Sequence, residues 1–311
     1  MKRFLILLSI FLFVISFYSC INDNVGVDVP NNDIADAPET EPQVETFISE
    51  YNKKDRDGVI EYTDRLSDEF KSYRSMLDDS NKVLYDMILP YVLSYTPFTI
   101  SVINKDYDLD DIFAAAQSIR FDYPETWLYF GTSTDRAGDR IVSYSSMYFS
   151  VKYTMENIEN FDKDYVAAYI EKVDGVCDEI LQKMPKGIST FEKYLWLANY
   201  LCSITEYEMD TYGKHFYADG PLLYGKGICQ SYAFAYQWLC QRAGLWCTTC
   251  SGGVDEESHI WNVVKLDNGK TYYMDLTWAD GDQIDYQYYF MTYEKATESR
   301  DIYEGEWIAD G

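Results

Sequence analysis

Apolar side chains recur three or four positions apart through much of the first half of the chain, from about Glu45 to Met184. This period is typical of helices that bury one face. It is clear in the run Tyr62, Leu66, Phe70 and Tyr73, and in the run Val83, Met87 and Val92. The second run contains Pro90, where we expect the helix to break because proline has no amide hydrogen. A longer helix is predicted over Val166–Met184, ending before Pro185.

Two stretches in this half predict strands instead, Phe98–Val102 and Ile141–Tyr153. The second stretch follows a turn that contains Gly138. No group of residues of catalytic type is found in the sequence of this half. We therefore expect it to act as a scaffold.

The last third of the chain mixes helical and strand patterns. Ser189 and Glu192 form a capping-box sequence, which predicts a helix beginning after Ser189 and running to about Ile204. A second helix is predicted from Cys229 to about Gly244. Three strands are predicted after it: Trp246–Ser251, His259–Leu266 and Thr271–Thr277.

The turn between the last two strands decides whether His259 and Asp275 can meet. A two-residue turn at Asn268-Gly269 places the two side chains on opposite faces of the sheet. A three-residue loop with Gly269 in the left-handed conformation sets His259 opposite Thr277 instead. Asp275 then lies diagonal to His259 on the same face, with Cβ atoms a little under about 7–8 Å apart. A site that uses both residues therefore predicts the three-residue loop.

The charge balance excludes some classes of partner. The 311 residues include 26 Lys and Arg against 52 Asp and Glu, a formal charge of −26. Nucleic acids and anionic membrane surfaces are bound through clustered basic residues, which this sequence lacks. With 47% hydrophobic and 17% aromatic residues, the chain is too apolar to be disordered and can bury a large core.

The N-terminus predicts a targeting segment. Two basic residues precede an apolar run, Phe4–Phe17, which is shorter than the ~20 residues of a membrane-spanning helix. The run is followed by Ser19-Cys20, which resembles a bacterial lipoprotein signal and implies that Cys20 carries the lipid; an uncleaved anchor is the alternative. We expect a signal peptide over 1–20 and an acidic, flexible tether over 21–45. The protein is then exported and held at the membrane only by its N-terminal lipid.

Cys229 is the candidate nucleophile. Gly225 and Gly227 precede it, so the chain can turn sharply into a helix whose first turn contains the cysteine. The positive end of a helix dipole favours a thiolate, the form that attacks an acyl carbon. His259, one of only 2 histidines, is the candidate acid and base, and Asp275 is the candidate residue that orients it. The amide N–H of Cys229 is the natural first oxyanion donor, and the sequence names no second one.

Three motifs, in this order, resemble the bacterial transglutaminase-like superfamily: Gly227–Ala233, Ser258–Val263 and Tyr273–Trp278. Tyr288–Phe290 and Arg300-Asp301 also resemble the segment that follows these motifs in the superfamily. The resemblance covers about 189–303 and implies a papain-related fold with a Cys-His-Asp triad. It assigns Cys229 as nucleophile, His259 as general base and acid, and Asp275 as the orienting acid. The superfamily includes peptidases, acyl transferases and inactive members, so the resemblance does not fix the reaction.

The expected fold class is α+β. It comprises a papain/transglutaminase-like core, with the helix bearing the cysteine packed on an antiparallel sheet, and a mainly helical N-terminal region. We place the helical region at 46–187 and the transglutaminase-like domain at 188–311. Phe121–Glu125 resembles a segment that often precedes such domains. Ile260 stands where the superfamily usually has alanine, which narrows the space beside His259.

The remaining cysteines do not predict a metal site. Cys247 and Cys250 have a ligand-like spacing, but no second pair follows, and on a strand they face opposite sides. We therefore expect neither a metal nor a cofactor. A disulfide such as Cys202–Cys240 fits an oxidising compartment, whereas an odd number of buried-looking cysteines fits free thiols, and both remain open. His215 is expected to be an exposed bystander.

These features predict an extracytoplasmic enzyme that hydrolyses or transfers the acyl group of an amide in a protein or peptide. Hydrolysis is slightly favoured over cross-linking, because the sequence marks no second amine-binding site. Cell-wall peptides are one candidate substrate, suggested by location alone. The alternative is a catalytically silent module of the same fold that binds a peptide or glycan at the cell surface.

Overall fold

The computed structural model describes residues 48–50, 62–96, 98–100, 109–131, 133–137, 140–145, 162–208, 215–255, 257–303 and 305–311. The predicted signal peptide, the tether and Cys20 lie outside these ranges, so their assignment stays a prediction. Within these ranges, no helix combines the length and the apolar character needed to cross a membrane.

The first half of the described chain is mainly helical, as predicted. Its helices are η1 (Asp68–Phe70), α2 (Ser72–Met76), α3 (Asp79–Leu93), α4 (Leu109–Asp122), η2 (Pro124–Leu128) and α5 (Lys163–Lys183). Its strands form one antiparallel sheet in the order β1-β2-β4-β3: β1 (Ile48–Glu50), β2 (Phe98–Ile100), β3 (Ser133–Ala137) and β4 (Arg140–Ser145). The predicted strand Ile141–Tyr153 is present as β4 as far as Ser145, and its end lies outside the described residues.

The predicted break at Pro90 is wrong. Helix α3 continues through Pro90 to Leu93, so the missing proline amide costs one hydrogen bond close to the end of the helix. Of the three residues that predict the buried face, Val92 is buried, Met87 is half-buried and Val83 is exposed. The residues of α3 that are buried are Leu84, Tyr85, Ile88, Leu89 and Val92. Burial of this face contributes more to the stability of the helix than Pro90 takes away.

The run from Tyr62 to Tyr73 is also not one helix. Tyr62 is exposed, and the helical part is divided between η1 and α2 at Lys71. The division follows from a tertiary contact, because the carboxylate of Asp122 accepts the amides of Tyr73 (2.8 Å) and Arg74 (3.0 Å) at the start of α2. A distant residue therefore caps the second helix.

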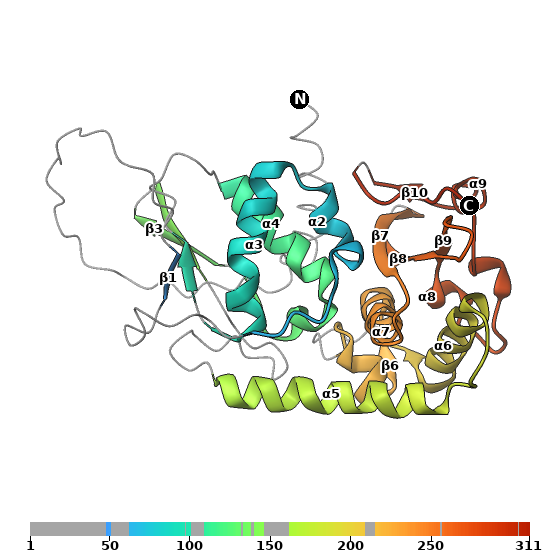
Figure 1. Cartoon of the computed structure of the whole chain (residues 1–311). Coiled ribbons are helices and arrows are strands. Elements are labelled where there is room, and N and C mark those ends of the chain that lie inside the picture. Colours follow the sequence, from blue (N-terminus) through green and yellow to red (C-terminus); the bar gives the residue numbers. More distant parts are fainter. Residues whose placement is uncertain are drawn as a thin grey trace, which may run out of the picture.

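The second half forms an α+β unit. Its helices are α6 (Thr190–Ile204), η4 (Gly220–Tyr224), α7 (Cys229–Arg242), α8 (Leu276–Ala279), η5 (Tyr286–Tyr288) and α9 (Tyr293–Ala296). Its strands are β5 (Glu206–Tyr207), β6 (Lys226–Gly227), β7 (Cys247–Val254), β8 (Glu257–Lys265), β9 (Thr271–Met274) and β10 (Asp301–Ile302). An antiparallel sheet has the order β10-β7-β8-β9, and α7 packs against β7 and β8 (Figure 1). The predicted class, with the helix bearing the cysteine on an antiparallel sheet, is confirmed.

The hairpin between β8 and β9 has the predicted three-residue register. Lys265 pairs with Thr271, and continuing this register sets His259 opposite Thr277. Gly269 has φ +81°, the left-handed conformation that the loop requires. The return strand is shorter than predicted, however, because β9 ends at Met274 and the chain turns there into α8.

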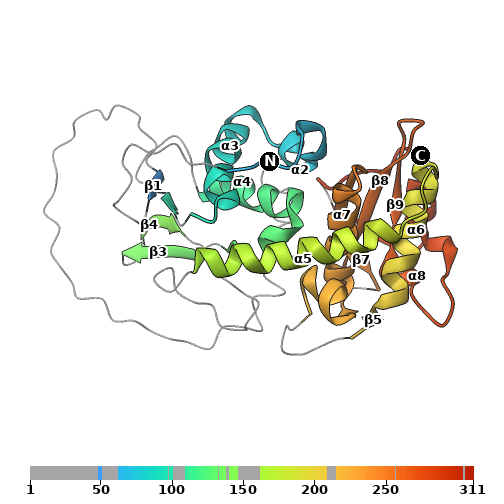
Figure 2. The same ribbon diagram turned by 60° about the horizontal axis from the view of Figure 1, so that its bottom comes forward.

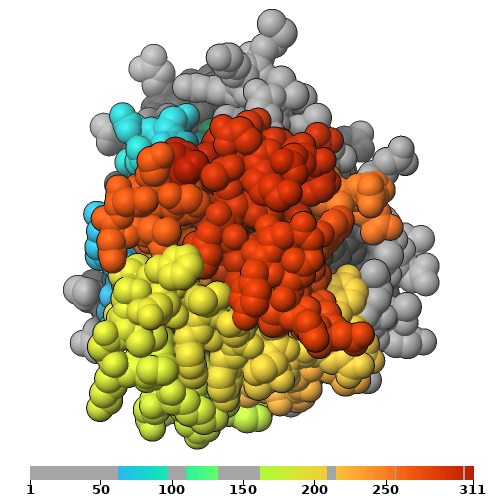
Figure 3. All heavy atoms as spheres, turned by 90° about the vertical axis from the view of Figure 1, so that its right-hand side faces the viewer, coloured from blue at the N-terminus to red at the C-terminus, as the bar shows by residue number. Residues whose placement is uncertain are grey.

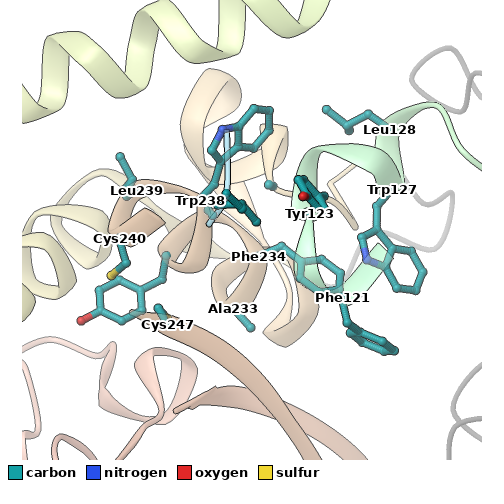
Figure 4. Packing of buried hydrophobic residues seen from close by; sticks show 14 of the residues in the cluster. Phe121, Tyr123, Trp127, Leu128, Ala233, Phe234, Trp238, Leu239, Cys240 and Cys247 are labelled. Atoms are coloured by element: carbon teal, nitrogen blue, oxygen red, sulfur yellow. The ribbon is translucent and has the colours of Figure 1, made fainter. Parts of the chain in front are cut away.

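One hydrophobic core contains residues from both sides of the predicted boundary at 187/188. Phe121 and Trp127 of the first half pack against Phe234 of α7 (Figure 4). The side-chain amides of Gln237 and Gln241 donate to the carbonyls of Phe121 (2.7 Å) and Asp122 (2.8 Å). The segment that resembles an upstream motif of the superfamily therefore lies directly on α7. The boundary itself stays a prediction.

Helix α5 connects the two halves along one side of the molecule. It lies beside α7 and η4, and in both ribbon views it runs from the first sheet towards α6 (Figures 1 and 2). Seen from the side of the second half, the C-terminal segments in red lie above the yellow helical segments (Figure 3). The core beneath is thus covered by segments from distant parts of the chain.

Candidate active site

Cys229 is the first residue of α7 and is half-buried. The side-chain oxygen of Ser231 accepts the amide of Ile228 (2.7 Å), which fixes the turn into the helix. Gly227 is required by this close approach, since a Cβ there would lie 2.5 Å from the Ser231 oxygen. The amide of Cys229 is among the first N–H groups of a helix, which have no partner within the helix. The local sequence therefore presents both a sulfur and an N–H donor at one point.

His259 and Asp275 are in direct contact, as the register predicts. His259 lies on β8, and its Nε2 is 2.9 Å from Oδ2 of Asp275. Asp275 caps α8, with Oδ1 accepting the amide of Trp278 at 3.2 Å. The aspartate is therefore held by a helix cap rather than by the predicted strand. Because Nε2 faces Asp275, Nδ1 is the ring nitrogen left for Cys229.

Electrostatics favour the charged forms of the pair. Burial lowers the pKa of His259, but the charge of Asp275 and hydrogen bonds with Asp275 and Cys229 outweigh it and raise the pKa to about 10. Burial raises the pKa of Asp275, yet the charges of His259 and Arg300 bring it below its usual value. At neutral pH the pair is therefore an imidazolium and a carboxylate, with the sulfur hydrogen-bonded on the other side of the ring.

Two polar contacts fix α7 relative to the rest of the site. The buried side-chain amide of Asn262 on β8 donates to the carbonyl of Ala233 in α7 at 2.9 Å. The hydroxyl of Tyr232, one turn after Cys229, donates to Asp280 at 2.6 Å, directly after α8. These contacts hold the helix that carries the sulfur against the strand and the cap that carry the other two residues.

Three further residues lie around the site, and the sequence predicts no role for them there. Arg300 is buried and donates from Nη1 to Oδ2 of Asp275. Trp278 lies with its ring centre 6.2 Å from that of His259 and is 36% exposed. Tyr207 is 44% exposed, and burial together with the charges of Cys229 and Glu257 raises its pKa. Trp278 belongs to the third sequence motif and Arg300 to the segment that resembles the one after it, whereas Tyr207 meets the site through chain folding.

The cysteines considered for a metal site or a disulfide, and His215, lie away from the His259–Asp275 contact. Cys247 belongs to the main core and Cys250 to a second cluster, so the two do face opposite sides of β7. Cys202 and Cys240 are both free thiols, and burial raises the pKa of Cys202 to about 12. His215 is half-buried rather than exposed, with its ring 5.6 Å from that of Tyr224. Within the described part of the chain, none of these cysteines forms a hydrogen bond with His259 or Asp275, and neither does His215.

The site thus joins a helix that begins at a cysteine, a histidine on the adjoining antiparallel sheet and an acid after the next strand of an α+β fold. No family model matches the chain, and no curated protein matches it. Matches among solved structures are distant. One is a transglutaminase (TGase), with 18% identity and a TM-score of 0.32, covering 47% of this chain and 43% of that chain. Another is a Cytophaga hutchinsonii protein proposed to be a cysteine protease, with 11% identity and a TM-score of 0.33, covering 56% of this chain and 65% of that chain. The chain thus matches less than two thirds of the length of either structure.

Proposed function

We propose that this protein is a thiol-dependent enzyme that hydrolyses or transfers the acyl group of an amide in a protein or peptide outside the cytoplasm. The observation that supports the proposal most directly is the continuous contact from Cys229 through His259 to Asp275 at the start of a buried helix. Buried thiols are usually inert, but a protonated imidazole beside a thiol stabilises the thiolate. Cys229 is also the one described cysteine that is not fully buried.

The geometry suggests the order of steps. The sulfur of Cys229 attacks the amide carbon and forms a thioester, while the amide N–H of Cys229 stabilises the oxyanion. His259 gives its Nδ1 proton to the leaving amine as the C–N bond breaks. Water, or a second amine, then donates a proton to His259 as it attacks the thioester and releases the sulfur. Asp275 remains a carboxylate throughout and keeps the imidazole in one orientation.

For the second oxyanion donor our candidate is Tyr207. Strand β5 places this residue beside Gly227, two positions before the nucleophile, in a parallel pair with β6. Its raised pKa keeps the hydroxyl protonated at neutral pH, where it can donate a hydrogen bond. Hydrolysis remains slightly favoured over cross-linking, and cell-wall peptides remain the candidate substrate suggested by the predicted export.

The proposal can be tested without a known substrate. The alkylation rate of each cysteine by iodoacetamide is measured against pH, with the modified peptides resolved by mass spectrometry. The reference is the same chain unfolded in urea, in which every thiol reacts at its intrinsic rate. We expect Cys229 to react faster in the folded protein than in the unfolded one below about pH 7, because only the fold places an imidazole beside its sulfur.

His259→Ala should remove this advantage, while the buried thiol of Cys177 should stay slow in both proteins. If folded Cys229 is no faster than unfolded Cys229, or if His259→Ala leaves its rate unchanged, the proposed reaction is wrong. That outcome would favour the silent binding module, and the search would turn to peptide and glycan ligands.

A further inference from the structure

Arg300 lies far from the active-site motifs along the chain but is fixed against them by the sheet. It directly precedes β10, which pairs with β7 through Asp301–Gly253 and Ile302–Gly252. Gly252 in turn pairs with His259 on β8. A Cβ at Gly252 would collide with the carbonyl oxygen of Asp301, so glycine is needed for β10 to approach β7 this closely. The ladder therefore sets Arg300 in register with the histidine.

The side chain of Arg300 is fully buried, and its surroundings suit a charged group. Its Nη1 donates to Oδ2 of Asp275, the same oxygen that faces His259. Its Nε and Nη2 have no hydrogen-bond acceptor within the described part of the chain. Instead the guanidinium carbon lies 5.1 Å from the ring centre of Trp261, 5.3 Å from that of Trp278 and 5.7 Å from that of Tyr288. Three aromatic rings thus stabilise the guanidinium charge, in addition to its one hydrogen bond with Asp275.

Two cations therefore share one carboxylate oxygen. A single buried aspartate can avoid its desolvation cost by taking up a proton, but arginine stays charged in proteins and prevents this. The positive charge of Arg300 also opposes the pull of Asp275 on the proton of His259. Cys229 from α7 and Asp275 from the cap of α8 act electrostatically on His259, and Arg300, from the segment before β10, acts on Asp275. Strand β7 presents only Gly252 opposite the histidine.

We propose that Arg300 is a positioning residue of this site, which holds the Asp275 carboxylate ionised and aimed at His259 and lets His259 release its proton more readily. The role would keep the orienting acid in one state through a cycle in which His259 loses and regains its charge. This inference rests on the proposed function, since a proton has to be released only if the site is catalytic. The electrostatic part, however, can be measured without any reaction.

The test uses the Cys229→Ala chain, which removes the sulfur from the measurement and should lower the titration midpoint of His259. With only 2 histidines in the sequence, a His215→Gln variant suffices to assign the ring resonances in an NMR titration. In this chain Arg300→Gln should raise the midpoint of His259 by about one pH unit, because a neighbouring positive charge is lost. Arg300→Lys keeps the charge and should leave the midpoint within about 0.3 units.

An unchanged or lowered midpoint in a folded Arg300→Gln protein would overturn the proposal, because a merely structural arginine need not move it in this direction. Should Arg300→Gln fail to fold, a second measurement leaves Arg300 intact. In His259→Ala, the carboxyl carbon resonance of Asp275, assigned with Asp275→Asn, should still report an ionised group at about pH 6. Uptake of a proton by Asp275 near neutral pH would show that Arg300 does not hold it ionised.

The two proposals fail separately. Slow alkylation of Cys229 in the wild-type protein would refute the reaction and leave the titrations untouched, since neither titration uses the sulfur. Fast alkylation of Cys229 combined with an unmoved His259 midpoint would refute only the role of Arg300.

Discussion

Asp275→Asn is the change that tests the electrostatics of the site most directly. The asparagine keeps the size of the side chain but removes the charge that His259 and Arg300 share. The substitution leaves the arginine buried without its counter-charge, and breaking a buried ion pair in this way costs about 3–5 kcal/mol. We therefore expect a protein that is less stable than the wild type at every pH, and one whose stability depends differently on pH.

The size of the pH effect follows from the pKa of His259, which is raised from 6.5 to about 10 in the folded protein. Its stabilisation is complete below the unfolded value of 6.5 and is lost as the pH rises through about 10. Within this window the folded chain holds one more proton, so the free energy of unfolding falls by about 1.4 kcal/mol per pH unit. The whole effect is at most about 5 kcal/mol, and part of it belongs to Cys229.

Urea unfolding followed by tryptophan fluorescence, from about pH 6.5 to about pH 9, measures this slope. Only the difference between wild type and variant is used, because the buried tyrosines and cysteines titrate alike in both. Asp282→Asn serves as the matched control, since it removes one negative charge from an exposed loop position. We expect Asp282→Asn to keep the slope of the wild type and Asp275→Asn to lose most of the His259 contribution. An unaltered slope in Asp275→Asn would refute the ion pair as the source of the raised pKa.

Three further changes test other parts of the structure. Cys229→Ala should abolish turnover of any substrate found and change the free energy of unfolding by less than about 1 kcal/mol, and residual turnover would rule out the thiol mechanism. Gly227→Ala, whose Cβ would lie 2.5 Å from Ser231, should cost about 1–3 kcal/mol in urea unfolding and slow Cys229 alkylation, whereas wild-type values would show that the turn can relax. Burial raises the pKa of Glu306 from 4.5 to about 7, although its carboxylate accepts a hydrogen bond from Tyr73 (2.9 Å). The contribution of Glu306 to the free energy of unfolding is therefore complete below pH 4.5 and is lost as the pH rises through about 7. Between these two pH values the free energy of unfolding should fall less steeply with pH in Glu306→Gln than in the wild type. An equally steep fall would show that another group titrates.

Features that depend on neighbouring residues could be predicted from the sequence. Of the two registers that the sequence allows for the β8–β9 hairpin, the one in which His259 can meet Asp275 is present, and Gly269 has the positive φ that it requires. The capping box of Ser189 and Glu192 is present, and α7 ends two residues before Gly244, which has φ +68°. Each of these signals lies within a few residues of the element it determines.

Features that depend on distant residues could not be predicted. Arg300 reaches Asp275 across 25 positions, and only the pairing of β10 with β7 brings it there. The apolar alternation predicts a strand through Asp275, but it does not show that Asp275 caps a helix by accepting the amide of Trp278. The continuation of α3 through Pro90 depends on a buried face whose partners lie in other elements.

The contact between Tyr73 and Glu306 has a consequence for how the chain reaches its folded state. The two side chains are 233 positions apart, and the Ser72–Thr248 contact beside them spans 176. Closing loops of such length costs conformational entropy before any contact compensates it, so this part of the core forms late. During synthesis the hydroxyl of Tyr73, in the first half, must wait for Glu306, near the C-terminus, before it finds this acceptor. Until then this part of the chain would expose apolar surface to proteases and chaperones.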